Sequence, residues 1–228
     1  MGDKKQKEAA MKKVKQVLVV GACVLFVVLM ILSGMGSSWL TMFTVIKPGD
    51  NVVIDFTMYD ANGNPVLTSS QQTYTKAAEK GRNVIISRQL SIIPGQNLTS
   101  TIYPIMIYSN TEGWTKDYAL FSTEYDAINR QLVGMKTGDQ KRIQIPNSSI
   151  AQEWSAAQLY NNSVDINDLK AGDFFALGVS DDPEAMAKNT SVTYTRIGQI
   201  SNKTNESVIV ELGYPTADIS IVSINAKN

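Results

Sequence analysis

The stretch Leu132–Pro146, LVGMKTGDQKRIQIP, constrains the fold more than any other part of the sequence. Ahead of it, Thr123–Asp126 have the spacing of a capped helix start, and Gly134 stands where a helix would stop. Gly138–Asp139 form a turn pair, and Arg142–Ile145 then alternate polar and apolar residues up to a proline. The stretch therefore predicts a short helix, a tight turn and a half-buried strand.

Alternating apolar and polar residues predict strands on both sides of this stretch. Every second residue from Asn51 to Tyr59 is apolar, and Asp60–Pro65 supplies a hairpin turn through its Asn-Gly pair. Further strands are expected at residues 174–179, 192–200, 207–212 and 219–224, short helices at 72–80 and 150–159, and a loop at 113–120. Strands dominate and helices pack on them, so the expected class is α+β with mainly antiparallel pairing.

An uncharged stretch from Gln16 to Ile46 divides the chain. Residues 17–40 are apolar enough, and long enough, to cross a bilayer of about 30 Å as a transmembrane helix. Residues 1–16 form a basic tail with six lysines against two acidic residues, which places this end in the cytoplasm and the rest outside. The sequence thus predicts a single-pass membrane protein. Small residues at 34–37 also suit a signal-peptide cleavage site, although the apolar run is long for one, and whether the anchor is cleaved stays open.

Charge and composition exclude several classes of function. The 21 basic and 21 acidic residues balance, but with the tail set aside the remainder is acidic, which argues against nucleic acid as a partner. Cys23 is the single cysteine, so the outer domain must fold without a disulfide. The absence of histidine excludes Ser-His and Cys-His nucleophile pairs and histidine metal sites. Neither a metal nor a cofactor is expected.

Asparagine glycosylation is open for the predicted outer part of the chain. Six Asn-x-Ser/Thr sequences begin at Asn97, Asn147, Asn161, Asn189, Asn202 and Asn205. Several such sequences would occur by chance in a chain this rich in Asn, Ser and Thr, so the occupancy of these sites stays open.

Four separate stretches of the sequence agree with one known family. They are KPGDNVVIDFTMYDANGNPV at 47–66, INRQLVGMKTGDQKRIQIP at 128–146, ADISIVSI at 217–224, and the set VDINDLKAGDFF, TRIGQI and ESVIVELGYP between 164 and 215. The first three resemble the first hairpin, the central helix with its following strand, and the closing strand of FKBP-type peptidyl-prolyl isomerases. The last set resembles the chaperone domain that SlyD-like members carry inserted in the flap.

The resemblance implies a specific architecture. Residues 45–150 together with 213–228 would form an FKBP-like domain, a half-open antiparallel sheet wrapped on a helix. Residues 151–212 would form a smaller β-rich domain inserted in the flap. Residues 70–120 match the family poorly and form an enlarged segment whose role the sequence does not indicate.

The resemblance also implies a substrate groove and a client-binding surface. The groove would be lined by Phe56, Val66, Leu67, Tyr125, Ile128, Ile145 and Ile219, and clients would bind the inserted domain at Phe174, Phe175, Tyr194 and Tyr214. An apolar groove of this kind favours the twisted imide, which is less polar than the planar form, against an uncatalysed barrier of about 18–20 kcal/mol. Phe56 stands where the family has a tyrosine, and Val66–Leu67 stand where it has Phe-Asp, so the groove is degenerate.

Two hypotheses about function follow. In the first, the protein is a membrane-anchored FKBP-type isomerase or chaperone that binds unfolded or proline-containing polypeptides as they are exported, with weak or lost isomerase activity. In the second, it is a non-catalytic binding or structural subunit that uses the same fold to hold one partner. Binding of several unrelated clients would favour the first, and one stoichiometric partner the second.

Overall fold

The chain forms two units in a computed structural model, residues 1–44 and residues 45–228. Residues 15, 18–31, 44–182 and 193–225 are described. Residues 18–31 are helical. Within the described ranges no helix is long and apolar enough to cross a membrane, so the predicted transmembrane helix over 17–40 is wrong. Residues 32–40 of that prediction, and the basic tail 1–16 apart from Lys15, lie outside the described residues.

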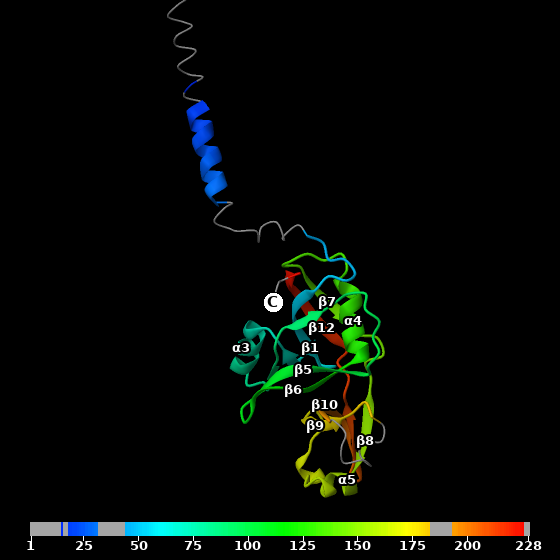
Figure 1. The fold of residues 1–228 in the computed structure, drawn as a ribbon. Helices are drawn as coiled ribbons and strands as arrows, with labels where there is room; N and C mark the ends of the chain where they lie inside the picture. The colour runs from blue at the N-terminus through cyan, green and yellow to red at the C-terminus, as the bar shows by residue number, and fades with distance from the viewer. Residues whose placement is uncertain (1–14, 16–17, 32–43, 183–192, 226–228) are drawn as a thin grey trace, which may run out of the picture. The chain divides into compact units, whose positions relative to one another are not determined.

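The second unit is built mainly of strands (Figure 1). In chain order its elements are β1 Val52–Tyr59, β2 Pro65–Thr68, α3 Gln71–Glu79, β3 Ile85–Ile86, β4 Leu90–Ile92, β5 Ile102–Ser109, β6 Gly113–Phe121, α4 Ser122–Leu132, β7 Gln140–Gln144, β8 Ala151–Ser155, α5 Ala156–Asn161, the 3-10 turn η1 Ile166–Asp168, β9 Phe174–Val179, β10 Tyr194–Lys203, β11 Ser207–Glu211 and β12 Thr216–Ile224. The predicted α+β composition of this part of the chain is therefore observed.

The first sheet has the order β3-β2-β1-β12-β7, and β4 pairs with the other end of β1. Strand β12 runs antiparallel between β1 and β7, but β3 runs parallel to β2. The parallel pair arises because helix α3 lies between β2 and β3 and carries the chain back to the starting end, as a crossover must. The prediction of a half-open antiparallel sheet is therefore wrong, because this sheet is mixed.

Local sequence explains helix α4 and the strand that follows it. The Glu124 carboxylate accepts the Phe121 backbone N–H at 3.0 Å, which satisfies one free donor at the helix start. Ile128 and Leu132, four residues apart, are both fully buried. Gly134 then adopts a φ of 91°, a left-handed conformation that favours glycine and ends the helix. Helix α4 packs against β7 and β6 (Figure 1).

The second sheet has the order β5-β6-β10-β11-β8, with β9 paired to the first half of β10. It is also mixed, because β10 runs parallel to β6 where Thr195 pairs with Tyr118. The sheet unites strands of the predicted insert, 151–212, with the hairpin β5–β6 from the enlarged segment. Residues 113–120, expected as a loop, form most of β6, and the helix expected at 150–159 is strand β8 followed by α5.

Two apolar cores stabilise this unit. The larger core joins the first sheet and α4 to the hairpin β5–β6, which contributes Ile105, Tyr118 and Leu120. The smaller core lies among strands β9, β10 and β11 and helix α5, and includes Leu159, Leu177 and Val210. The segment 151–212 thus has apolar packing of its own while its strand β10 pairs with β6.

A buried ion pair connects these elements. The guanidinium of Arg196 on β10 is 0% exposed and binds the Glu124 carboxylate, which is 1% exposed, at 3.0 Å and 2.5 Å. Arg196 also donates to the carbonyls of Ala119 and Leu212, both at 2.8 Å. Glu124 accepts the backbone N–H of Tyr214 at 3.2 Å. One contact set therefore ties β10 to the end of β6, the start of α4 and the segment after β11.

Aromatic rings surround this pair. The Arg196 guanidinium lies 3.9 Å from the Tyr214 ring centroid and 4.4 Å from that of Phe121. Burial alone would lower the pKa of Arg196, but the neighbouring Glu124 carboxylate and phenol groups outweigh it and the pKa is raised. The Arg196 side chain is therefore charged at all physiological pH values. The folded protein needs the Glu124 carboxylate beside it to offset this buried charge.

We expect Arg196→Met to destabilise the protein strongly, because it leaves the Glu124 carboxylate buried without its cation. Breaking such a pair costs about 3–5 kcal/mol. Urea unfolding of the full chain measures the change. The matched control is Arg130→Met on helix α4, whose Arg130–Asp126 pair is as short, 2.7 Å, but has an arginine that is 76% exposed. This control should change stability by less than about 1 kcal/mol. Equal losses in the two variants would contradict the structural role assigned to Arg196.

Candidate functional site

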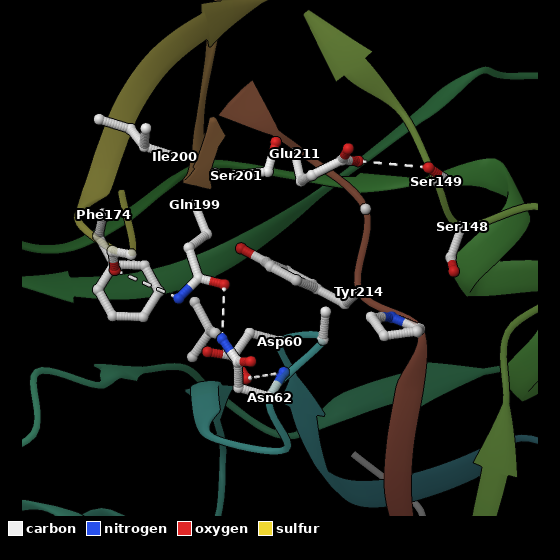
Figure 2. A pocket seen from close by; sticks show the side chains of 16 residues that line it. Asp60, Asn62, Ser148, Ser149, Phe174, Gln199, Ile200, Ser201, Glu211 and Tyr214 are labelled. Atoms are coloured by element: carbon white, nitrogen blue, oxygen red, sulfur yellow. Dashed lines mark hydrogen bonds between the residues drawn. The ribbon is translucent and has the colours of Figure 1, made fainter. Parts of the chain in front are cut away.

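A cavity of about 490 Å³ lies where the β1–β2 hairpin of the first sheet meets the second sheet. We call it the junction cleft (Figure 2). The hairpin turn contributes Asp60 and Asn62, the second sheet contributes Phe174 and Gln199, and the segment after β11 contributes Tyr214. Because its walls come from chain segments far apart in sequence, the cleft exists only when both sheets are in place.

Apolar side chains form part of the cleft surface. Phe174, the first residue of β9, is 39% exposed and borders the cleft, whereas Val66 and Tyr214 are buried and present one side to it. The Tyr214 hydroxyl donates to the Ile197 carbonyl at 2.7 Å and therefore accepts the hydrogen of the Tyr118 hydroxyl. Burial is the main cause of the raised pKa of both phenols, so both remain neutral. The ring of Tyr214 is thus held in one position.

Polar groups occupy the rim. Asn62 Nδ2 donates to Gln199 Oε1 at 3.3 Å, across the cleft, and Gln199 Nε2 donates to the Gly172 carbonyl at 3.2 Å (Figure 2). Asp60 is buried and accepts the backbone N–H groups of Asn62 and Asn64 at 2.9 Å and 2.7 Å, so its carboxylate stabilises its own turn. The amides of Asn62 and Gln199 each keep a second N–H, so both can still donate to a ligand on the rim.

Two glycines allow the chain to pass closely along the cleft wall. A Cβ at Gly213 would overlap the carbonyl oxygen of Ser148, and a Cβ at Gly198 would lie 2.5 Å from a Val210 methyl and 2.7 Å from the Glu211 carbonyl oxygen. At Gly213 the chain returning from β11 crosses the chain leaving β7. These close approaches bring the two ends of the 151–212 segment together beside the cleft.

A second cavity of about 550 Å³ adjoins the junction cleft. We call it the helix-side cavity, since Tyr74 and Ala78 of α3 border it together with the loop that follows this helix. Val66 and Phe174 line both cavities, so one apolar wall is common to them. The two cavities are therefore neighbours, and we call the pair the groove.

The predicted groove residues are placed mainly in the larger core. Five of them are buried there and border neither cavity of the groove: Phe56, Leu67, Ile128, Ile145 and Ile219. Val66 is buried in the same core but also lines the groove, and Tyr125 is half-buried with its ring stacked on Tyr103 at 4.3 Å. The hairpin β5–β6 packs Ile105, Tyr118 and Leu120 against this set, which fills the space beside Phe56.

The predicted client-binding residues are divided between the groove and the sheet. Phe174 and Tyr214 line the junction cleft. Phe175 packs against the smaller core, with its ring 6.1 Å from that of Trp154, and Tyr194 is half-buried at the start of β10. Five of the possible glycosylation sites are exposed: Asn97, Asn147, Asn161, Asn202 and Asn205. The sixth, Asn189, lies outside the described residues.

Several residues of the candidate site were not predicted from the sequence. Asn62, Gln199 and Glu211 border the cleft, and Arg196 contacts the ring of Tyr214. One signal was available for Arg196: it shares the alternating inward face of its strand with Gly198 and Ile200, where a charged residue needs a buried partner. Glu124 is not detectable as that partner, because it lies 72 residues away on a helix.

Comparisons with known proteins do not identify a family. No family model matches the chain, and a search of curated protein sequences gave no match. Across the part of the chain that the structure describes, no three acidic, cysteine or histidine side chains are grouped closely enough to hold a metal ion. The function must therefore be inferred from the geometry of the site.

A separate polar depression of about 450 Å³ lies on the first sheet beside the start of α3. Arg142 binds Asp218 through two hydrogen bonds of 2.6 Å and 2.7 Å, and the Tyr59 hydroxyl donates to the same carboxylate at 2.7 Å. Burial, followed by the hydrogen bond to Asp218, raises the pKa of Tyr59 to about 12. The three side chains are mutually satisfied, so the depression offers a ligand few free charges.

The raised pKa of Tyr59 predicts a pH dependence of stability. The folded protein favours neutral Tyr59, so the stabilisation is complete below the ordinary value of 10.0 and is lost as pH rises toward about 12. We expect Tyr59→Phe to be less stable than the wild type by about 1 kcal/mol at pH 7, with the gap closing above pH 10. Urea midpoints measured from pH 7 to 11.5 test this. Tyr160→Phe, at a position 79% exposed, should show no such gap, and a gap for Tyr59→Phe that persists at pH 11.5 would contradict the assignment.

Proposed function

We propose that this protein is an FKBP-like folding factor whose main activity is binding extended or unfolded polypeptide segments in the junction cleft. The observation that carries the proposal is the cleft itself. Its apolar wall of Val66, Phe174 and Tyr214 is rimmed by the amides of Asn62 and Gln199. Such a combination suits a polypeptide, whose apolar side chains need a dry surface and whose backbone needs hydrogen-bonding partners.

The arrangement of the chain supports the FKBP-like part of the proposal. Strands β2, β1, β12 and β7 form an antiparallel path, and helix α4 packs its Ile128 and Leu132 into the same core. Between β7 and β12 the chain makes the β-rich segment 151–212, in the position where the resemblance places a chaperone domain. The predicted location outside the cytoplasm and the predicted exported clients stay predictions.

The filled space beside Phe56 favours binding over catalysis. Five of the residues expected in an isomerase groove are buried in the larger core and border neither cavity of the groove, although Phe56 and Ile219 also border the polar depression on the first sheet. Prolyl isomerisation is the second candidate function, since the wall of Val66 and Tyr214 is apolar and would favour a twisted imide. A prolyl-peptide assay on the full chain separates the two: a rate equal to that in buffer rules out the catalytic function and leaves the binding function in place.

We expect Phe174→Ser to weaken polypeptide binding about tenfold, because the substitution removes the most exposed aromatic ring of the cleft. Fluorescence anisotropy with a labelled, permanently unfolded polypeptide gives the dissociation constant, and suppression of client aggregation gives a second measurement. The wild type should bind several unrelated clients. Binding of one stoichiometric partner only would instead favour the non-catalytic subunit.

The matched control is Tyr160→Ser on α5, which removes an aromatic side chain that is 79% exposed and does not border the cleft. Both variants should unfold at urea concentrations close to that of the wild type, since neither ring is fully buried. If the two substitutions weaken binding equally, or neither does, the junction cleft is not the binding site.

A further inference from the structure

The groove formed by the two cavities carries opposite charges on either side of its shared wall. Glu211 borders the junction cleft and does not border the helix-side cavity. Arg82 borders the helix-side cavity and does not border the junction cleft. Between them lies the wall of Val66 and Phe174, which lines both. The groove therefore has an acidic part, an apolar middle and a basic part.

The carboxylate of Glu211 is available to a ligand. Its Oε2 accepts a long hydrogen bond of 3.4 Å from Ser149, and the residue is half-buried. The other carboxylate of the junction cleft, Asp60, is used by its own turn. Among the described residues that line the junction cleft there is no lysine or arginine, so the negative charge of Glu211 is not neutralised within it.

The guanidinium of Arg82 is likewise available to a ligand, in this case one in the helix-side cavity. Arg82 is exposed in the loop after α3, where its backbone N–H donates to the Ala77 carbonyl at 3.0 Å. It is the one charged side chain among the described residues that line the helix-side cavity. The remaining lining combines apolar side chains, such as Val84 and Ile85, with the uncharged polar residues Asn83 and Asn110.

We propose that the groove selects polypeptide segments by charge: an apolar residue sits on Val66 and Phe174, a basic side chain faces Glu211, and an acidic side chain faces Arg82. This inference rests on the proposed function, because it names the class of segment that the same groove takes. The warrant is charge complementarity: Glu211 is half-buried, where an ion pair is screened less than on open surface, and Arg82 is exposed at the other cavity. A segment with the charges removed would keep the apolar contact and lose the selectivity.

Labelled peptides that differ at one position test the acidic part. Each set contains three peptides that share a central phenylalanine and carry lysine, glutamine or glutamate two residues away from it. In one set the variable residue precedes the phenylalanine, and in a second set it follows. We expect the lysine peptide to bind the wild type about fivefold more tightly than the glutamine peptide, and the glutamate peptide to bind more weakly still. Glu211→Gln should remove this preference and Glu211→Lys should reverse it.

Peptides with glutamate, glutamine or lysine on the other side of the phenylalanine test the basic part. We expect the wild type to bind the glutamate peptide about fivefold more tightly than the glutamine peptide, and Arg82→Gln to remove this preference. The controls are Glu206→Gln and Arg130→Gln, whose side chains are exposed and border neither cavity. Raising the salt concentration should reduce the preferences of the wild type and leave binding of the glutamine peptides nearly unchanged.

The outcomes separate the inference from the proposed function. If no peptide and no unfolded polypeptide binds the wild type, both fail. If the peptides bind, and Phe174→Ser weakens them, but lysine, glutamine and glutamate peptides have equal affinities, charge selection is overturned and the binding function stands. Preferences that survive Glu211→Gln and Arg82→Gln would likewise overturn the assignment of these two residues.

Discussion

The buried pair of Glu124 and Arg196 is the interaction on which the rest of the structure depends. Moving two charges out of water costs several kcal/mol for each ion, and this cost is met only when the ions are close and their other hydrogen-bonding groups are satisfied. Here the guanidinium contacts a carboxylate and two backbone carbonyls, and the carboxylate also accepts two backbone N–H groups. Apolar packing tolerates small shifts between two sheets, whereas this set of contacts is satisfied in one arrangement. The pair therefore determines how β10 meets β6 and α4.

The same contacts determine the shape of the cleft. Glu124 holds the backbone of Tyr214, Arg196 lies against its ring, and the hydroxyl is held by Tyr118 and the Ile197 carbonyl. The backbone N–H and the hydroxyl of Tyr214 are thus both engaged, so its buried ring has a fixed position in the cleft wall. A surface prepared in this way loses little side-chain entropy on binding, and this favours affinity for segments that are themselves disordered.

Elements governed by local rules were predictable, and elements governed by distant contacts were not. Gly134 and Gly138 have the positive φ values that their turn positions require, and the alternation in 51–59 and 207–212 gives strands β1 and β11. In contrast, β6 begins with mixed polar residues and ends in an apolar run without alternation, and it becomes a strand because β5 and β10 pair with it. Five of the predicted groove residues are buried in the larger core, but periodicity cannot show whether a buried face is covered by a ligand or by another hairpin. The pair of Glu124 and Arg196 could not be predicted from a local pattern, because the two residues are 72 positions apart in the sequence.

The position of the candidate site follows from that covering hairpin. Once β5 and β6 pack on the first sheet, the interior beside Phe56 is core, and a ligand can reach only surfaces that the hairpin leaves open. One concave surface that it leaves open lies where the β1–β2 turn, α3 and the second sheet approach one another. Val66 belongs to both regions, since its side chain is buried in the core and borders both cavities. The enlarged segment 70–120 therefore has a physical role: it closes one apolar groove, and through α3 and Arg82 it builds part of another.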